Sequence, residues 1–286
     1  MNRLVIVTAL LCGASCSAEA VEAPALRFTA IPDDAKSHLQ ARFEPVAAHL
    51  SAALGVPVEY VPTSDYQGSV EAFKNGDVQL AWFGGLTGVR ARAAVPGARA
   101  IAQGRVDPEF NSYFIAHKDT GLSPTIDFPA GLAGKTFTFG SDSSTSGRLM
   151  PEYWIRQETG KSPQELFAGD EMSFSGDHSK TAILVQAGTF DAGVLNYKVY
   201  DAMVADGKID PAVCVKLWET PTYPDYNWTA HPDLGDELID KLQAALVGMT
   251  DPALLAAAQR TEGIIAASNE DFAPLESLAR GPNLLR

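Results

Sequence analysis

Residues 136–147 concentrate hydroxyl side chains between a strand-like stretch and a predicted helix, in the sequence TFTFGSDSSTSG. Backbone N–H groups at a helix N-terminus are unpaired and carry a partial positive charge. Ser144, Thr145 and Ser146 add hydroxyl donors to them. Such a junction can bind an anion without Lys or Arg. A plain serine cap with a solvated loop would have the same sequence, so both interpretations stay open.

A second strand–loop–helix junction has the sequence FSGDHS at residues 174–179. Gly176 lets a ligand approach the backbone closely. His178 falls at the start of the next predicted helix, where it could donate to an anion; the alternative is an ordinary surface histidine. Both junctions follow the carboxyl ends of strands, where open α/β sheets bind ligands, and this favours a shared site.

A third segment, TPTYPDYNW at residues 220–228, combines prolines, aromatic residues and Asp225. Its aromatic side chains could simply fill a crossover between two lobes. An Asp225 carboxylate facing an anion would repel it unless the ligand brought a proton donor. Protonated phosphite, a phosphonate monoanion or an amino group would satisfy that carboxylate, whereas fully deprotonated selenate or sulfate would not.

Two further segments lie nearer the N-terminus. Asp65 and Tyr66 open a predicted helix, so the Tyr66 hydroxyl could donate from the opposite wall of a cleft. Trp82 lies near the end of a continuously apolar strand and is either a core residue or a wall of the ligand site. Gly84 and Gly85 follow it, and they either expose backbone N–H groups or make a tight turn.

The elements that must position these residues alternate between strands and helices. The predicted strands are 26–31, 57–61, 78–83, 112–116, 135–140, 171–174, 191–195, 213–218 and 226–230, and the predicted helices are 36–54 (interrupted by Pro45), 66–75, 146–159, 179–187, 197–204, 236–247 and 252–259. Right-handed crossovers make the first three strands a parallel sheet. We predict an α/β fold in which lobe II (113–221) is inserted into lobe I (21–112 plus 222–286), with the cleft between them.

The first twenty residues read as an export signal rather than as structure. Arg3 precedes an apolar run at 4–14, and an A-x-A site ends at Ala20, so we expect export with cleavage after Ala20. The alternative is a lipoprotein signal ending at Cys16. No later stretch approaches the ~18 apolar residues of a transmembrane helix.

The amino-acid composition and net charge exclude several classes of protein. The chain has 286 residues, of which 46% are hydrophobic and 20% charged, and this indicates a globular protein. A net charge of −13 argues against nucleic-acid partners and against docking on anionic lipid. Cys214 is the one cysteine after the signal; we expect a small buried hydrophobe rather than a redox or metal residue. The scattered histidines predict no metal and no cofactor.

Five short segments, in this order, resemble the periplasmic phosphonate and phosphite binding proteins of ABC importers. They are Ser64-Asp65-Tyr66, Ala81-Trp82-Phe83-Gly84, Ser144-Thr145-Ser146-Gly147, Ser175-Gly176-Asp177-His178 and Pro224-Asp225. The resemblance runs from about 26 to 249. It implies a type II periplasmic-binding-protein fold with a two-strand closing hinge, a small oxyanion ligand, an ABC permease as partner and no catalytic residue. The oxyanion pocket maps onto Tyr66, Ser144, Thr145, Ser146, His178 and Asp225, with Asn196 as a neighbour and Trp82 as a candidate wall.

The sequence also departs from that family. Phe110 aligns with a tyrosine of aminoalkylphosphonate binders and cannot donate a hydrogen bond. Residues 84–86 and 226–228 resemble a subgroup described as selenate importers. The charge argument at Asp225 favours phosphite or a small alkylphosphonate, with selenate or another oxyanion second. We expect a monomer.

Three alternatives remain at this stage. The same fold can present its closed form to a membrane histidine kinase, as a sensor. It can also bind a small heterocycle such as a pyrimidine, although the hydroxyl-rich loop argues against this. A hydrolase would need a nucleophile elbow, and the sequence contains no G-x-S-x-G.

Overall fold

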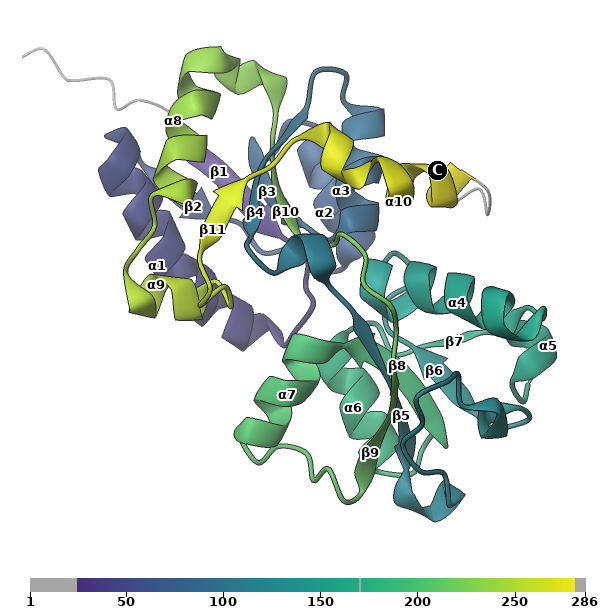
Figure 1. Ribbon diagram of the computed structural model, residues 1–286. Coiled ribbons are helices and arrows are strands. Elements are labelled where there is room, and N and C mark those ends of the chain that lie inside the picture. Colours follow the sequence, from purple (N-terminus) through teal and green to yellow (C-terminus); the bar gives the residue numbers. More distant parts are fainter. Residues whose placement is uncertain (1–24, 170, 281–286) are drawn as a thin grey trace, which may run out of the picture.

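The computed structural model describes residues 25–169 and 171–280, which form two α/β lobes (Figure 1). Lobe I holds the N-terminal and C-terminal parts of the described chain, and lobe II holds its middle (Figure 1). Each lobe is built on one mixed β-sheet. The predicted two-lobed architecture is confirmed. The signal peptide at 1–20, its cleavage after Ala20 and the alternative lipidation of Cys16 lie outside the described residues.

The lobe I sheet has six strands in the order β11-β4-β10-β3-β1-β2. They are β1 (Leu26–Ala30), β2 (Val58–Tyr60), β3 (Leu80–Phe83), β4 (Arg99–Gly104), β10 (Asn227–Ala230) and β11 (Ile264–Ala266). β1 is parallel to β2 and to β3, as predicted, because each connection crosses over through a helix. β10 is antiparallel to both of its neighbours, so the chain re-enters lobe I in the middle of the sheet.

The lobe I helices are α1 (Lys36–Leu54), α2 (Tyr66–Lys74), α3 (Gly85–Ala94), α8 (Gly235–Val247), α9 (Pro252–Ala257) and α10 (Ala273–Arg280). α1 runs through Pro45 instead of being interrupted there, and its apolar face, including Phe43 and Leu50, is buried. α3 was not predicted. All of its residues from Gly85 to Ala91 are buried, so it lacks the one-sided apolar stripe by which a helix is recognised.

The lobe II sheet has five strands in the order β7-β6-β8-β5-β9. They are β5 (Ser112–His117), β6 (Phe137–Phe139), β7 (Ser173–Phe174), β8 (Ala192–Asn196) and β9 (Cys214–Glu219). The helices are α4 (Met150–Thr159), α5 (Pro163–Leu166), α6 (His178–Gln186) and α7 (Tyr197–Ala205). β6 runs parallel to β7 and β8, so the segments that follow these three strands leave the same edge of the sheet.

Two chain segments connect the lobes, one between β4 and β5 and the other between β9 and β10. They lie side by side where Phe110 and Tyr223 exchange two backbone hydrogen bonds of 2.9 Å each. The Asp107 carbonyl accepts from the Asp225 N–H at 2.9 Å. The Asp107 carboxylate forms a buried ion pair with Arg260 at 2.7 Å. The connection therefore fixes the backbone of Asp225 where the chain returns to lobe I.

Each lobe has its own hydrophobic core. Cys214 is a free cysteine buried in lobe II, and burial raises the pKa of its thiol to about 12, which fits the expected small hydrophobe. Within residues 25–169 and 171–280, no helix combines the length and apolar character that crossing a bilayer requires.

Candidate functional site

Four buried polar atoms mark a site between the lobes. Lobe I contributes Tyr66 Oη and Asp225 Oδ2, and lobe II contributes Ser146 Oγ and His178 Nε2. None of the four has a hydrogen-bond partner among the described residues. Buried polar groups are normally paired. A small polar ligand held between the lobes would provide partners for these four atoms, two from each lobe.

Tyr66 is the first residue of α2 and is 2% exposed. Asp65 caps this helix by accepting from the Gly68 N–H at 2.7 Å. Burial, together with the nearby carboxyl groups of Asp33 and Asp225, raises the pKa of Tyr66 well above its ordinary value. The hydroxyl therefore stays protonated and can donate.

The hydroxyl groups of the serine-rich loop, on Ser144, Thr145 and Ser146, lie in three different environments. Ser144 caps the following turn by accepting from Gly147 N–H at 2.9 Å, so the plain-cap interpretation describes this residue. Thr145 Oγ1 accepts from the Leu86 N–H of lobe I at 3.0 Å. Ser146 Oγ is buried without a partner in the described chain. The turn, Thr145–Leu149, is π-helical, a form common at functional sites.

His178 begins α6 and is completely buried, so the surface-histidine alternative is wrong. Its Nδ1 accepts from the Asn196 N–H at 3.3 Å. Burial lowers the pKa of His178 to about 3, which keeps the ring neutral at ordinary pH. A neutral ring that accepts at Nδ1 carries its proton at Nε2. The unpartnered Nε2 is therefore a donor.

Asp225 is held against the start of α3. Its Oδ1 accepts from the Gly85 N–H at 2.8 Å, so this glycine exposes a backbone donor at a helix start. A Cβ at Gly84 would lie 3.2 Å from the same oxygen and 3.3 Å from Thr145 Oγ1, so glycine permits this close approach. Burial raises the pKa of Asp225 to about 7. Near neutral pH its Oδ2 can either donate or accept.

Asp225→Asn is expected to stabilise the unligated protein at pH 8 but not at pH 4. The folded wild type holds a proton on Asp225 up to about pH 7. The unfolded chain releases that proton near the ordinary value of 3.8. Stability therefore falls as the pH rises from about 4 to about 7, by roughly 4 kcal/mol for this group. Asn resembles the protonated form and avoids that loss. Urea unfolding of both proteins at the two pH values measures it; a difference that does not depend on pH would contradict it.

Three other predicted site residues meet at Tyr226, which the sequence did not identify as a site residue. Asn196 Nδ2 donates to Tyr226 Oη at 2.9 Å, while its Oδ1 caps α7 by accepting from Val199 N–H at 3.2 Å. Trp82 stacks on the Tyr226 ring with centroids 4.4 Å apart. Phe110 packs edge-on against that ring at 5.3 Å. Through these contacts, Asn196, Trp82 and Phe110 hold the Tyr226 side chain in place.

Asp33, just after β1, was also missed. It is fully buried, and its Oδ1 accepts from Arg42 at 3.2 Å while its Oδ2 accepts from the Tyr226 hydroxyl at 3.2 Å. Burial raises the pKa of Asp33, and the Arg42 charge opposes that rise. Its position at the carboxyl end of a buried parallel strand is the signal that could have identified it.

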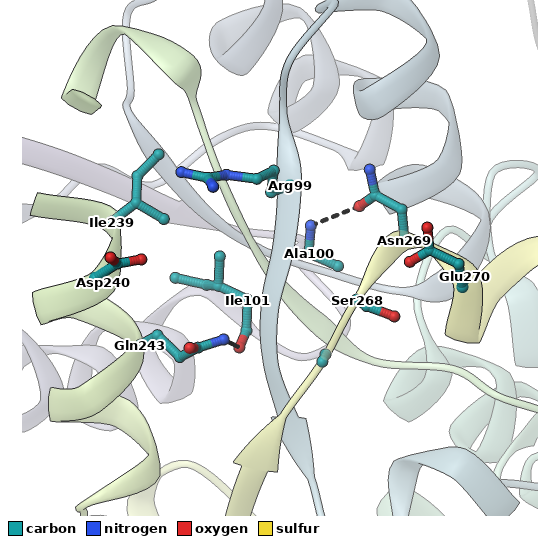
Figure 2. A pocket seen from close by; sticks show the side chains of 10 residues that line it. Arg99, Ala100, Ile101, Ile239, Asp240, Gln243, Ser268, Asn269 and Glu270 are labelled. Atoms are coloured by element: carbon teal, nitrogen blue, oxygen red, sulfur yellow. Dashed lines mark hydrogen bonds between the residues drawn. The ribbon is translucent and has the colours of Figure 1, made fainter. Parts of the chain in front are cut away.

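A separate groove of about 320 Å³ lies on lobe I between α8, β4 and the segment after β11 (Figure 2). No predicted site residue lines it. Two of its polar side chains are already used, since Asn269 accepts from the Ala100 N–H at 2.8 Å and Gln243 donates to the Ile101 carbonyl at 2.7 Å (Figure 2). Within the described residues, no group of three or more His, Cys, Asp or Glu could hold a metal ion.

Comparison with known proteins places the chain in a family. The family model described as "ABC transporter, phosphonate, periplasmic substrate-binding protein" matches residues 28–272. The probable ABC transporter phosphite binding protein PhnD1 of Prochlorococcus marinus (strain MIT 9301) is 37% identical over 230 residues, 78% of this chain and 77% of that protein. The phosphate-import protein PhnD of Mycolicibacterium smegmatis (strain ATCC 700084 / mc(2)155) is 32% identical over 227 residues, 76% of this chain and 70% of that protein.

The structure of Prochlorococcus marinus PhnD1 in complex with methylphosphonate superimposes with a TM-score of 0.85 at 35% identity, covering 91% of this chain and 98% of that chain. The type II periplasmic-binding-protein fold is thereby confirmed. These findings support the transport interpretation, not the sensor, heterocycle or hydrolase alternatives, because the matching family and relative are named as phosphonate and phosphite binding proteins of ABC transporters. The chain belongs to the family of periplasmic substrate-binding proteins of phosphonate ABC transporters.

Proposed function

We propose that this protein captures a small phosphorus oxyanion, phosphite or a short alkylphosphonate, and delivers it to an ABC permease. The observation that carries this proposal is the set of four orphaned buried atoms on Tyr66, Ser146, His178 and Asp225. A tetrahedral oxyanion presents several acceptor oxygens to neighbours on different sides. Relatives named for phosphite and solved with methylphosphonate support the same ligand class. Selenate stays the second candidate.

The four groups together select a protonated oxyanion. Tyr66, Ser146 and His178 are neutral donors, and the N-terminal ends of α2 and α6 add partial positive charge beside Tyr66 and His178. Asp225 is the one titratable group of the four near neutral pH. When ionised, it can accept the P–OH proton of a monoanion but repels a fully deprotonated dianion.

Capture follows from closure of the lobes. Leu86 N–H donates to Thr145 across the cleft at 3.0 Å, and Ser179 Oγ donates to Asp34 at 2.8 Å. A ligand bound to Ser146 and His178 of lobe II gains Tyr66 and Asp225 only when the lobes close, so it shifts the equilibrium toward the closed form. The closed form would dock on the permease, and release needs opening alone, with no covalent step.

Export, domain limits and oligomeric state complete the proposal. Residues 1–20 would act as a signal peptide cleaved after Ala20, which delivers the mature chain to the periplasm, with lipidation of Cys16 as the alternative. The lobes would divide at 112/113 and 221/222. The mature chain would act as a monomer, because each molecule contributes both walls of its own site.

Calorimetric titration of residues 21–286 at pH 7 tests this proposal. The ligands are phosphite, methylphosphonate, aminoethylphosphonate, phosphate, selenate, selenite and sulfate. We expect submicromolar binding of phosphite or methylphosphonate, with sulfate and selenate much weaker. A clear preference for sulfate or selenate would contradict the charge argument at Asp225. No binding of any oxyanion would overturn the proposed function.

A further inference from the structure

We propose that Tyr226 is an interlobe latch, a side chain whose hydroxyl joins the two lobes only when the cleft closes. Tyr226 lies just before β10 of lobe I and is 1% exposed. Its hydroxyl accepts from Asn196 Nδ2, at the end of β8 in lobe II, at 2.9 Å. The same hydroxyl donates to Asp33 Oδ2 of lobe I at 3.2 Å.

The latch belongs to a closed circuit of four residues. Asn196 N–H donates to His178 Nδ1 at 3.3 Å, and the His178 N–H donates to the Asp33 carbonyl at 3.3 Å. Asp33, Tyr226, Asn196 and His178 are thus joined in a ring that crosses between the lobes twice. The ring fixes Nδ1 of His178 as the acceptor and leaves Nε2 as the donor. Closure therefore joins Tyr226 to Asn196, the residue whose backbone N–H orients a predicted ligand donor within lobe II.

The surroundings of Tyr226 show which hydrogen bond of its hydroxyl must break when the lobes separate. Trp82 of β3 stacks on its ring at 4.4 Å, and the Arg260 guanidinium lies 4.8 Å from the ring centroid. Both neighbours belong to lobe I, as does Asp33, which Arg42 holds at 3.2 Å. Tyr226 and Asp33 therefore stay together when the lobes separate. Of the two hydrogen bonds of the Tyr226 hydroxyl, the one to Asn196 is lost on opening, together with the bond from the His178 N–H to the Asp33 carbonyl.

A residue that favours closure and a residue that contacts the ligand should affect ligand binding differently. In an open cleft, water solvates Asn196 Nδ2 in place of the tyrosine hydroxyl. The bond from that hydroxyl to Asp33 lies within lobe I and is common to both forms, so its loss does not shift the equilibrium between them. In the closed cleft, losing that hydroxyl leaves a buried amide donor unpartnered, which penalises closure alone. Because apparent affinity scales with the closed, binding-competent fraction, every ligand should weaken by the same factor. A residue that touches the ligand would instead change the order of ligand preference.

Tyr226→Phe tests the latch with two readouts. We expect roughly tenfold weaker binding of phosphite and methylphosphonate, with their affinity ratio unchanged. We also expect a smaller closed fraction of the unligated protein, measured by single-molecule energy transfer between dyes on Lys74→Cys and Lys161→Cys, which are exposed positions on the two lobes. Buried Cys214 should not compete for labelling.

Tyr200→Phe is the matched control, because its hydroxyl donates to the Cys214 carbonyl at 2.7 Å within lobe II. It should lower stability without changing affinity or closed fraction. Asn196→Ser is the second variant: serine can still cap α7 but cannot supply the amide donor. It should weaken binding in the same way, and combining it with Tyr226→Phe should add little.

The affinity measurement rests on the proposed function, but the closed fraction of the unligated protein does not. The two readouts therefore distinguish failure of the latch from failure of the proposed function. An unligated closed fraction that is the same with and without Tyr226→Phe would overturn the latch, whatever the ligand. A changed ratio of phosphite to methylphosphonate would also overturn it, since Tyr226 would then act as a direct contact. If the wild type bound no oxyanion, the proposed function would fail, and the closed fractions would still decide on the latch.

Discussion

Replacing Thr145 and Ser146 together by alanine is expected to weaken oxyanion binding by at least about tenfold, since a hydrogen bond to a charged group is worth about 1.5–3 kcal/mol. Ser146 Oγ is buried and makes no hydrogen bond within the described chain, so its proton is available to a bound anion or to the neighbouring Asp225 carboxyl. The Thr145 hydroxyl accepts from Leu86 N–H, which leaves its own proton for Asp225 or the ligand. The measurement is calorimetric titration with the tightest ligand of the wild type.

Ser123→Ala combined with Thr125→Ala is the matched control for this double variant. These residues lie in a surface loop of lobe II, where the Thr125 hydroxyl bonds the Asp127 carbonyl at 2.7 Å. The control removes the same two hydroxyl types and should bind as the wild type does. Wild-type affinity in the Thr145→Ala, Ser146→Ala protein would remove the serine-rich loop from the site.

Asp225→Asn is expected to improve selenate and sulfate relative to phosphite by roughly tenfold, the size of one hydrogen bond to a charged group. The amide can keep an oxygen toward Gly85 N–H, which Asp225 accepts at 2.8 Å, and present its NH₂ to the ligand. It then donates to a deprotonated oxyanion that a carboxylate would repel. An unaltered ratio would show that Asp225 does not select the protonation state of the ligand.

The pH dependence provides a second check on Asp225. Sulfate stays fully deprotonated across the neutral range, whereas the Asp225 carboxyl loses its proton near pH 7. Wild-type affinity for sulfate should therefore fall as the pH rises through 7, and that of Asp225→Asn should stay level. Asp127→Asn, in a loop of lobe II, serves as the charge-matched control and should follow the wild type.

Local sequence chemistry predicted much of the fold and part of the site. The ends of α1 agree with the predicted 36–54. The apolar stripe of the helix stops just before Gly55, which ends the helix by adopting a left-handed conformation with φ 70°. Tyr66 and His178 were identified because each stands at the start of a predicted helix, and in the structure each directly follows an aspartate that caps its helix. Both signals lie within a few neighbouring residues.

The remaining features depend on contacts that local patterns do not contain. Tyr226 and Asp33 are 193 residues apart in the chain, yet they share a hydrogen bond of 3.2 Å. The aromatic character of Tyr226 fitted a packing role as well as a polar one. Helix α3 was missed because its buried surface extends around the helix, which removes the amphipathic period.

The most direct test of the account is a crystal structure of residues 21–286 grown with phosphite. We expect the oxyanion to be enclosed between the lobes, with its oxygens about 3 Å from Tyr66 Oη, Ser146 Oγ, His178 Nε2 and Asp225 Oδ2. An oxyanion bound elsewhere, or a closed cleft in which those four atoms still lack partners, would contradict it.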